Sequence, residues 1–210
     1  MKKLIKITAL IIILFVLAAC NRKPYYKFNQ DAKDFFIFKT GSWWLYENEQ
    51  TLERDCMYIA KEGLEFKRIS DETNYYHDLG LPVFASKDSV FYGDATYFSS
   101  ISGITHINEN IIYKDVYYLS SNFEFPLTET DTLYESESDG IKYITEKKIY
   151  IVENKLYDKI KTLGYQNNLQ VSIYQKEVIR ERNHGMIKYY RKKDTDEVIL
   201  NLIDFNINDL

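Results

Sequence analysis

The feature that most constrains this chain is an alternation of apolar and polar residues in its last third. Leu169, Val171 and Ile173 are separated by single polar residues, and a second row of apolar residues at the same spacing runs from Val198 to Leu202. Side chains of a β-strand point alternately to opposite faces, so a period of two is typical of strands with one buried face. The spacing therefore favours antiparallel sheet over helix in this region.

Two turns divide the region into strands. Asn183-His184-Gly185 separates two strand-like runs, and Gly185 can take the positive φ that a tight hairpin requires. The polar segment 193–196 is typical of a second turn. We therefore predict that residues 169–206 form a three-stranded meander.

The composition extends this prediction to the rest of the chain. The sequence has 19 Tyr, 12 Phe and 2 Trp together with many Ile, Val and Thr, which favour strands, whereas Ala, the best helix former, is scarce. We expect a mainly β fold, namely a curved antiparallel sheet, half-barrel or sandwich with few short helical turns. Further strand-like runs that end in turn residues are 43–47, 55–60, 89–92, 111–119 and 149–152.

Three segments depart from this pattern. Residues 31–35 are predicted to form a brief helical turn before the first strand. Residues 154–163 place apolar residues at helical spacing, yet a turn followed by a strand fits them too, and we favour the strand. Residues 68–88 are rich in turn formers and are predicted to be a loop or irregular connection.

The N-terminus carries the pattern of a bacterial lipoprotein signal peptide. A basic start is followed by an apolar stretch from Ile7 to Val16 and then by Leu17-Ala18-Ala19-Cys20. We expect cleavage between Ala19 and Cys20 and acylation of Cys20 by two or three chains such as palmitate, because one chain binds a membrane only marginally. The alternative is an uncleaved transmembrane helix, but the apolar core of about 13 residues is shorter than the roughly 20 that span a bilayer.

Cleavage would define the domain organisation. We expect a signal peptide at 1–19, an acylated tether at 20–28, a single antiparallel β domain at 29–206 and a tail at 207–210. The net charge moves from −4 to −7 because three lysines leave with the signal. An acidic chain argues against a nucleic-acid partner. The tether residues Asn21-Arg22-Lys23-Pro24 lack the acidic cluster that resembles a surface-export signal, which favours the periplasmic face of the outer membrane over the cell surface.

Short motifs in the chain resemble a group of envelope lipoproteins. The opening segment Gly41-Ser42-Trp43-Trp44-Leu45-Tyr46 and the later Gly185-Met186-Ile187-Lys188 are similar to the Gly-x-x-Trp-x-Tyr strand and the closing Gly-[Ile/Leu/Met]-[Ile/Val]-Lys hairpin of bacteroidete-type envelope lipoproteins. The middle, residues 61–140, is similar to no such family. The resemblance implies a strongly curved antiparallel sheet in the cell envelope and transfers no catalytic residue.

The opening aromatic residues are the candidate ligand contacts. On a strand, Trp44 and Tyr46 share one face and Trp43 takes the other. One of these faces is expected to pack in the core, and the aromatic rings also suit contact with a carbohydrate or a lipid. A ligand platform at Trp43, Trp44 and Tyr46 is therefore one expectation, with core packing as the alternative.

The sequence shows no common catalytic motif. A Gly-x-Ser-x-Gly elbow, a Gly-rich phosphate loop and a His-Glu-x-x-His motif are all absent. His77, His106 and His184 stand in separate contexts, Cys56 is expected to be a buried, inert thiol, and residues 194–197 lack the pattern of a calcium loop. We predict no catalytic residue, no metal site and no cofactor.

The expected role is that of a non-catalytic envelope lipoprotein that binds an envelope protein, glycan or lipid. An assembly subunit of this kind would have an exposed apolar patch or an unpaired edge strand. A hydrolase of envelope polymers is one alternative, and it needs two carboxylates, or a histidine with a nucleophile, in one cleft. A lipid or lipoprotein carrier resembling the Lol-type half-barrels is the other. The carrier needs an open, apolar concave face, and a filled core would exclude it.

Overall fold

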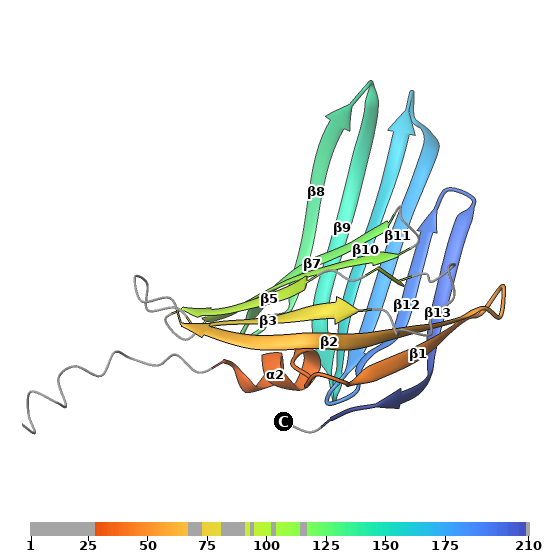
Figure 1. Ribbon diagram of the computed structural model, residues 1–210. Helices are drawn as coiled ribbons and strands as arrows, with labels where there is room; N and C mark the ends of the chain where they lie inside the picture. Colours follow the sequence, from red (N-terminus) through yellow and green to blue (C-terminus); the bar gives the residue numbers. More distant parts are fainter. Residues whose placement is uncertain are drawn as a thin grey trace, which may run out of the picture.

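The computed structural model describes residues 28–66, 73–80, 91–92, 95–101, 104–113 and 117–208. These residues form an antiparallel sheet of 13 strands and one short helix, α2 (Gln30–Phe36) (Figure 1). The expected mainly β fold with an open, curved sheet is confirmed. Ala19, Cys20 and most of the tether lie outside the described residues. The strands are β1 (Trp43–Asn48), β2 (Arg54–Phe66), β3 (Thr73–Gly80), β4 (Phe91–Tyr92), β5 (Ala95–Ile101), β6 (Ile104–Tyr113), β7 (Tyr117–Phe125), β8 (Thr130–Ser138), β9 (Ile141–Val152), β10 (Lys155–Gln166), β11 (Leu169–Glu181), β12 (Gly185–Lys193) and β13 (Asp196–Asn206).

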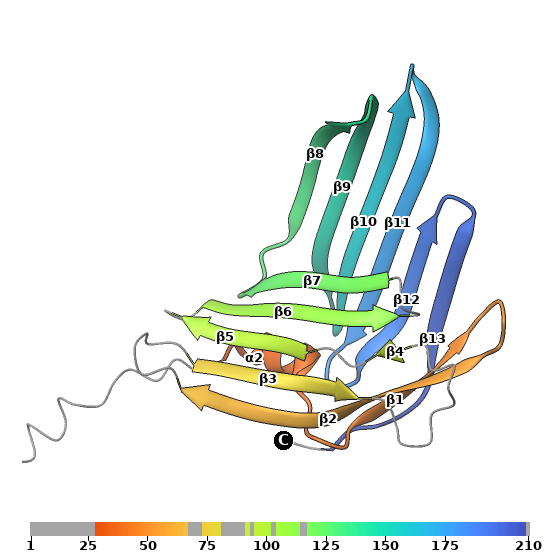
Figure 2. The same cartoon turned by 45° about the horizontal axis from the view of Figure 1, so that its top comes forward.

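Two blades make up the sheet. We call β1 to β7 the first blade and β8 to β13 the second blade, and within each blade the strands follow one another largely as a meander. The blades join where β1 pairs with β13. The second blade stands at an angle to the first, and its hairpins project beyond it (Figures 1 and 2). Among the strands that the structure describes, β8 ends the strand order on one side and β7 pairs with β6 alone, so the sheet is not closed.

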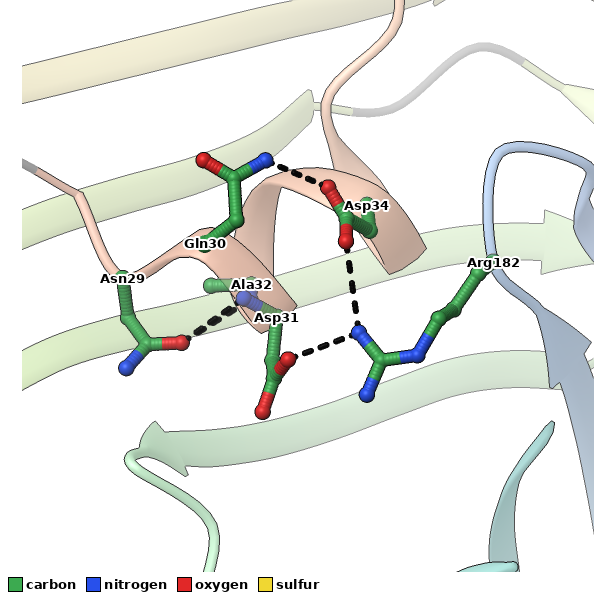
Figure 3. Close-up of polar contacts among 6 residues, drawn as sticks. All are labelled: Asn29, Gln30, Asp31, Ala32, Asp34 and Arg182. Carbon is green, nitrogen blue, oxygen red and sulfur yellow. Dashed lines mark hydrogen bonds and ion pairs between the residues drawn. The ribbon is translucent and has the colours of Figure 1, made fainter. Parts of the chain in front are cut away.

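Helix α2 forms because a capping residue precedes a short amphipathic run. The Asn29 side chain accepts hydrogen bonds from the N–H groups of Asp31 (2.9 Å) and Ala32 (3.4 Å), which satisfies donors at the start of the helix (Figure 3). Ala32, Phe35 and Phe36 are buried at a spacing of three and four residues. The predicted helical turn at 31–35 is confirmed.

The buried face of α2 packs between the two blades. Each large apolar side chain that leaves water contributes about 1.5–3 kcal/mol, so this contact ties the blades together. We call the sheet face that it covers the inner face. The cluster consists of Phe28, Ala32, Phe35, Phe36 and Ile37, with Ile107, Phe123 and Phe125 from the first blade and Ile149 and Leu156 from the second.

Several of the local predictions are confirmed, but the single run at 111–119 is wrong, because β6 ends at Tyr113 and β7 begins at Tyr117. The meander at 169–206 corresponds to β11, β12 and β13, and Gly185 has φ +77° at the hairpin. The favoured strand at 154–163 is β10. The predicted loop at 68–88 is wrong over Thr73–Gly80, because β3 pairs with both β2 and β5. The other residues of that segment lie outside the described part. Among the described residues, no helix is long and apolar enough to cross a membrane.

Candidate functional site

Two of the three candidate aromatic residues lie in the core. Trp44 is 2% exposed and Tyr46 is fully buried, whereas Trp43 is half-buried on the opposite face of β1. The Trp44 Nε1–H donates to the His184 carbonyl oxygen at 2.5 Å, and the Tyr46 hydroxyl donates to the Met186 carbonyl oxygen at 2.8 Å. Trp44 and Tyr46 are therefore core residues rather than a ligand platform, because neither ring reaches solvent.

Two of the histidines singled out by sequence, His106 and His184, lie in different blades and do not meet. His106 Nδ1 lies 3.3 Å from Glu124 in the first blade, while His184 Nδ1 lies 3.4 Å from Glu181 at the base of the second. His77 is a β3 residue. Within the described segments, no three His, Cys, Asp or Glu side chains are placed to hold a metal ion.

The remaining two candidates are also separate from these histidines. Cys56 is half-buried on β2. Burial raises the pKa of its thiol, and the neighbouring Asp55 carboxylate raises it further. Asp194 lies in the β12–β13 turn with φ +52°. The raised pKa makes Cys56 a poor nucleophile at neutral pH.

Beyond α2, the inner face of the second blade carries buried charge. Asp158 and Lys176 are 2% and 4% exposed, and Lys176 Nζ lies 3.3 Å from Asp158 Oδ2. Arg191, also 4% exposed, pairs with Asp196 at 3.1 Å. Charged groups need partners when they leave water. The described part of the inner face is therefore filled by α2 at its base. Beyond α2 it carries these buried ion pairs beside buried apolar side chains, among them Val178, Tyr189 and Leu200.

A cleft of about 540 Å³ lies beside α2, between the β11–β12 hairpin and the C-terminal segment. It holds His184 and Asp34, which are two of the groups that a hydrolase could use. The Asp34 carboxylate already accepts a hydrogen bond from Gln30 at 2.6 Å and pairs with Arg182 at 3.3 Å (Figure 3). The cleft lining includes no Ser, Thr or Cys. The lining of the cleft thus contains a histidine and the Asp34 carboxylate, which is already bonded to Gln30 and Arg182, and it contains no side-chain nucleophile.

β8 is an edge strand of the described sheet. All nine residues from Thr130 to Ser138 are exposed. β8 pairs with β9 on one side and ends the strand order on the other. Figure 2 shows this edge standing clear of β7 and the first blade. Such an edge presents unpaired N–H and C=O groups to any extended chain that approaches it.

The side chains of β8 differ between its two faces. The register with β9 places Thr130 opposite Ile149, so the even-numbered residues share the inner face. These are Thr130, Thr132, Tyr134, Ser136 and Ser138, each with a hydroxyl group. The outer face carries Asp131, Leu133, Glu135 and Glu137. Lys142 lies 2.8 Å from Glu135, and Lys148 lies 3.5 Å from Asp131, both from the β9 side.

The turn into β9 decides which backbone groups face outward. Asp139 and Gly140 have φ +52° and +72°, as in the two-residue turn of a tight hairpin. Ser138 and Ile141, which flank it, form the first hydrogen-bonded pair, and such pairs then alternate along the ladder. The even-numbered residues of β8 therefore bond to β9. The odd-numbered residues, which include the three carboxylates, direct their N–H and C=O groups to the free edge.

Comparison with known proteins identifies no family. No family model matches the chain, and no curated protein matches it. One solved structure, that of a "putative lipoprotein" from Parabacteroides distasonis, matches with a TM-score of 0.41 and 10% identity over 82% of this chain and 98% of that one. This similarity is too low to establish a common fold.

Sequence reasoning did not identify the β8 edge. Residues 130–138 alternate between hydroxyl side chains and, apart from Leu133, charged ones rather than between apolar and polar ones. The available signal was Asp139-Gly140, a dipeptide that favours a two-residue hairpin. A strand on each side of that dipeptide could have been predicted from it.

Proposed function

We propose that this protein is a lipid-anchored component of the bacterial envelope with a non-catalytic assembly role, in which β8 is the docking edge for a partner protein. The observation that carries the proposal is the edge of β8, with which no other described strand pairs and whose nine residues are all exposed. Main-chain groups at an open sheet edge give affinity for an added strand without a preformed pocket.

The anchor is the Cys20 thiol. Seven residues separate Cys20 from Phe28, where the described fold begins. An extended chain spans at most about 3.3–3.6 Å per residue, so the body would lie within roughly 30 Å of the leaflet. The tether composition favours the periplasmic face of the outer membrane. The proposed partner is thus another envelope protein near that surface.

Both alternatives have less support. An apolar carrier would need the inner face to be open, yet Phe35 and Phe36 occupy its base and Asp158 and Lys176 lie above them. A hydrolase would need a nucleophile or a second free carboxylate beside His184, and the cleft lining supplies neither.

Metabolic labelling tests the anchor. The native chain expressed in its own host should incorporate radiolabelled palmitate and fractionate with membranes, and Cys20→Ser should abolish both. Cys56→Ser is the matched control and should leave both unchanged. An unlabelled, soluble native chain would refute the anchor.

Chemical cross-linking tests the docking edge. When the membrane-bound protein is cross-linked and the cross-linked positions are mapped by mass spectrometry, a partner should be found at residues 130–138. Cross-links confined to other surfaces would refute the docking edge.

A further inference from the structure

The chemistry of β8 specifies the kind of segment that its edge would accept. We propose that β8 takes an extended segment of the partner protein that carries lysine or arginine at alternate positions, added to the sheet as a further strand next to β8. This inference rests on the proposed assembly role and adds the partner's chemistry to it.

The main chain of β8 is ready for a further strand. Asp131, Leu133, Glu135 and Glu137 direct their N–H and C=O groups to the free edge, and β8 shows no register shift against β9. An incoming strand can pair with these groups without disturbing the existing ladder. Hydrogen bonds to an open edge are the usual source of affinity when an extended peptide adds to a sheet.

The side chains favour a basic segment. The stretch 129–139 contains five carboxylates and no lysine or arginine. Lys142 and Lys148 contact the outer face from the β9 side, which leaves the opposite side of the carboxylate row open. Side chains directly across a strand pair lie about 4.5–5.5 Å apart, where opposite charges attract and like charges repel. A segment with basic side chains on its outer face matches this row.

Two details add to the match. Leu133, which is 67% exposed, interrupts the carboxylate row and favours one apolar residue at the matching position. The hydroxyl groups of the inner face suit threonine or serine in the added strand, because Thr–Thr and Thr–Ser pairs across strands are favourable. The expected segment therefore alternates basic residues with hydroxyl residues and has one apolar position.

A second copy of this chain does not fit the same edge. Pairing β8 with another β8 would place carboxylates opposite carboxylates, which destabilises a sheet. Charged residues on an edge strand are a known protection against self-association. The carboxylates on the outer face of β8 thus disfavour pairing with another copy of this chain and favour a partner segment of opposite charge.

The probe is a fluorescently labelled peptide, Lys-Thr-Lys-Thr-Val-Thr-Lys, whose order places lysines opposite the three carboxylates in an antiparallel pair. It is titrated with the full acylated chain in a neutral detergent, and binding is measured by anisotropy. A peptide with glutamate in place of each lysine is the control. We expect binding of the basic peptide only, with at least tenfold weaker affinity in 0.5 M salt, because salt screens exposed charges.

Two variants separate the main-chain contribution from the charge contribution. Leu133→Pro removes an N–H that faces the free edge, a position where proline is tolerated in an edge strand. It should weaken peptide binding at least tenfold while leaving the thermal midpoint near that of the wild type. The combined Asp131→Lys, Glu135→Lys and Glu137→Lys change should abolish binding of the basic peptide and create binding of the acidic one.

A matched control carries the same change of charge elsewhere. Glu49→Lys, Glu153→Lys and Asp204→Lys alter exposed carboxylates away from β8 and should leave binding of the basic peptide within about twofold, since distant exposed charges are screened. Equal binding by the β8 and control variants, normal binding by Leu133→Pro, or no binding by the folded wild type would each overturn the inference. Palmitate labelling and a cross-linked partner at residues 130–138 would still uphold the proposed function in those cases.

Discussion

The guanidinium group of Arg182 lies 2.7 Å from the Asp31 carboxylate, which joins the β11–β12 hairpin to the helix that follows the tether (Figure 3). The same group lies 3.3 Å from Asp34 and 4.7 Å from the centre of the Phe35 ring. One side chain therefore holds α2 by charge and by contact with an aromatic face. This arrangement fixes the position of α2 against the second blade.

Replacement of Arg182 should loosen this joint. Partly exposed ion pairs contribute up to about 1 kcal/mol, and a cation above an aromatic ring adds about 0.5–1 kcal/mol. We expect Arg182→Ala to lower the free energy of unfolding by about 1–2 kcal/mol in urea titrations. The free energy of unfolding of Arg182→Lys should lie between those of the wild type and Arg182→Ala, because lysine keeps the charge and lacks the planar guanidinium group. Equal midpoints for all three proteins would contradict the role assigned to Arg182.

Removal of the Phe36 side chain should be more costly. Phe36 is 5% exposed and packs 4.9 Å from Phe123, measured between ring centres. Truncation of a buried aromatic residue to alanine typically costs about 3–5 kcal/mol. We expect Phe36→Ala to show this loss in chemical denaturation. Leu169→Ala, at a side chain that is 71% exposed, is the control and should change stability little. Comparable effects of the two changes would mean that α2 does not form part of the core.

The Tyr46 hydroxyl gives a test of the junction between the blades. Tyr46→Phe removes the donor to the buried Met186 carbonyl oxygen. Loss of such a partner costs about 1–3 kcal/mol. Tyr157→Phe, on the outer face of β10 where the ring stacks on Tyr150, serves as the comparison and should cost less. Thermal midpoints of the two variants measure the difference, and a larger loss for Tyr157→Phe would refute this account.

The raised pKa of Cys56 predicts slow alkylation near neutral pH. Burial and Asp55 both favour the protonated thiol, so the reactive thiolate forms only as pH rises above the range of an ordinary cysteine. We expect the rate of iodoacetamide modification to be below that of a small thiol at pH 7.5 and to climb with pH. Asp55→Asn should shift this profile to lower pH. A profile unchanged by that substitution would show that Asp55 has no part in it.

The sequence predicted those elements in which local pattern and tertiary environment agree. The alternation from Leu169 onward matches strands with one face on the core, and Gly185 marks a turn that needs positive φ. The burial of Trp44 could not be predicted in the same way. Alternation separates Trp43 from Trp44 and Tyr46, but only tertiary packing, in which Trp44 and Tyr46 join residues of β12 and β13 in one cluster, decides which face is buried.

β3 and β8 are among the strands that escaped prediction, and the two cases are related. β3 reads as a loop because its sequence is polar, yet it has neighbours on both sides. β8 has no buried residue, so it lacks the alternation of apolar and polar residues by which a strand is ordinarily predicted. Instead, both faces of β8 carry exposed side chains, most of them polar. The candidate docking edge was missed for the same reason that makes it accessible.

The pairing of β1 with β13 has a consequence for the order of folding. β1 lies between β2 and β13, so a nascent chain that has produced only its first half can pair β1 with β2 but still lacks its second neighbour, β13. Contacts between residues so distant in sequence slow folding. Completion of this sheet must therefore wait until β13 has been synthesised, and a chaperone that shields the early strands would be of greatest use before that moment.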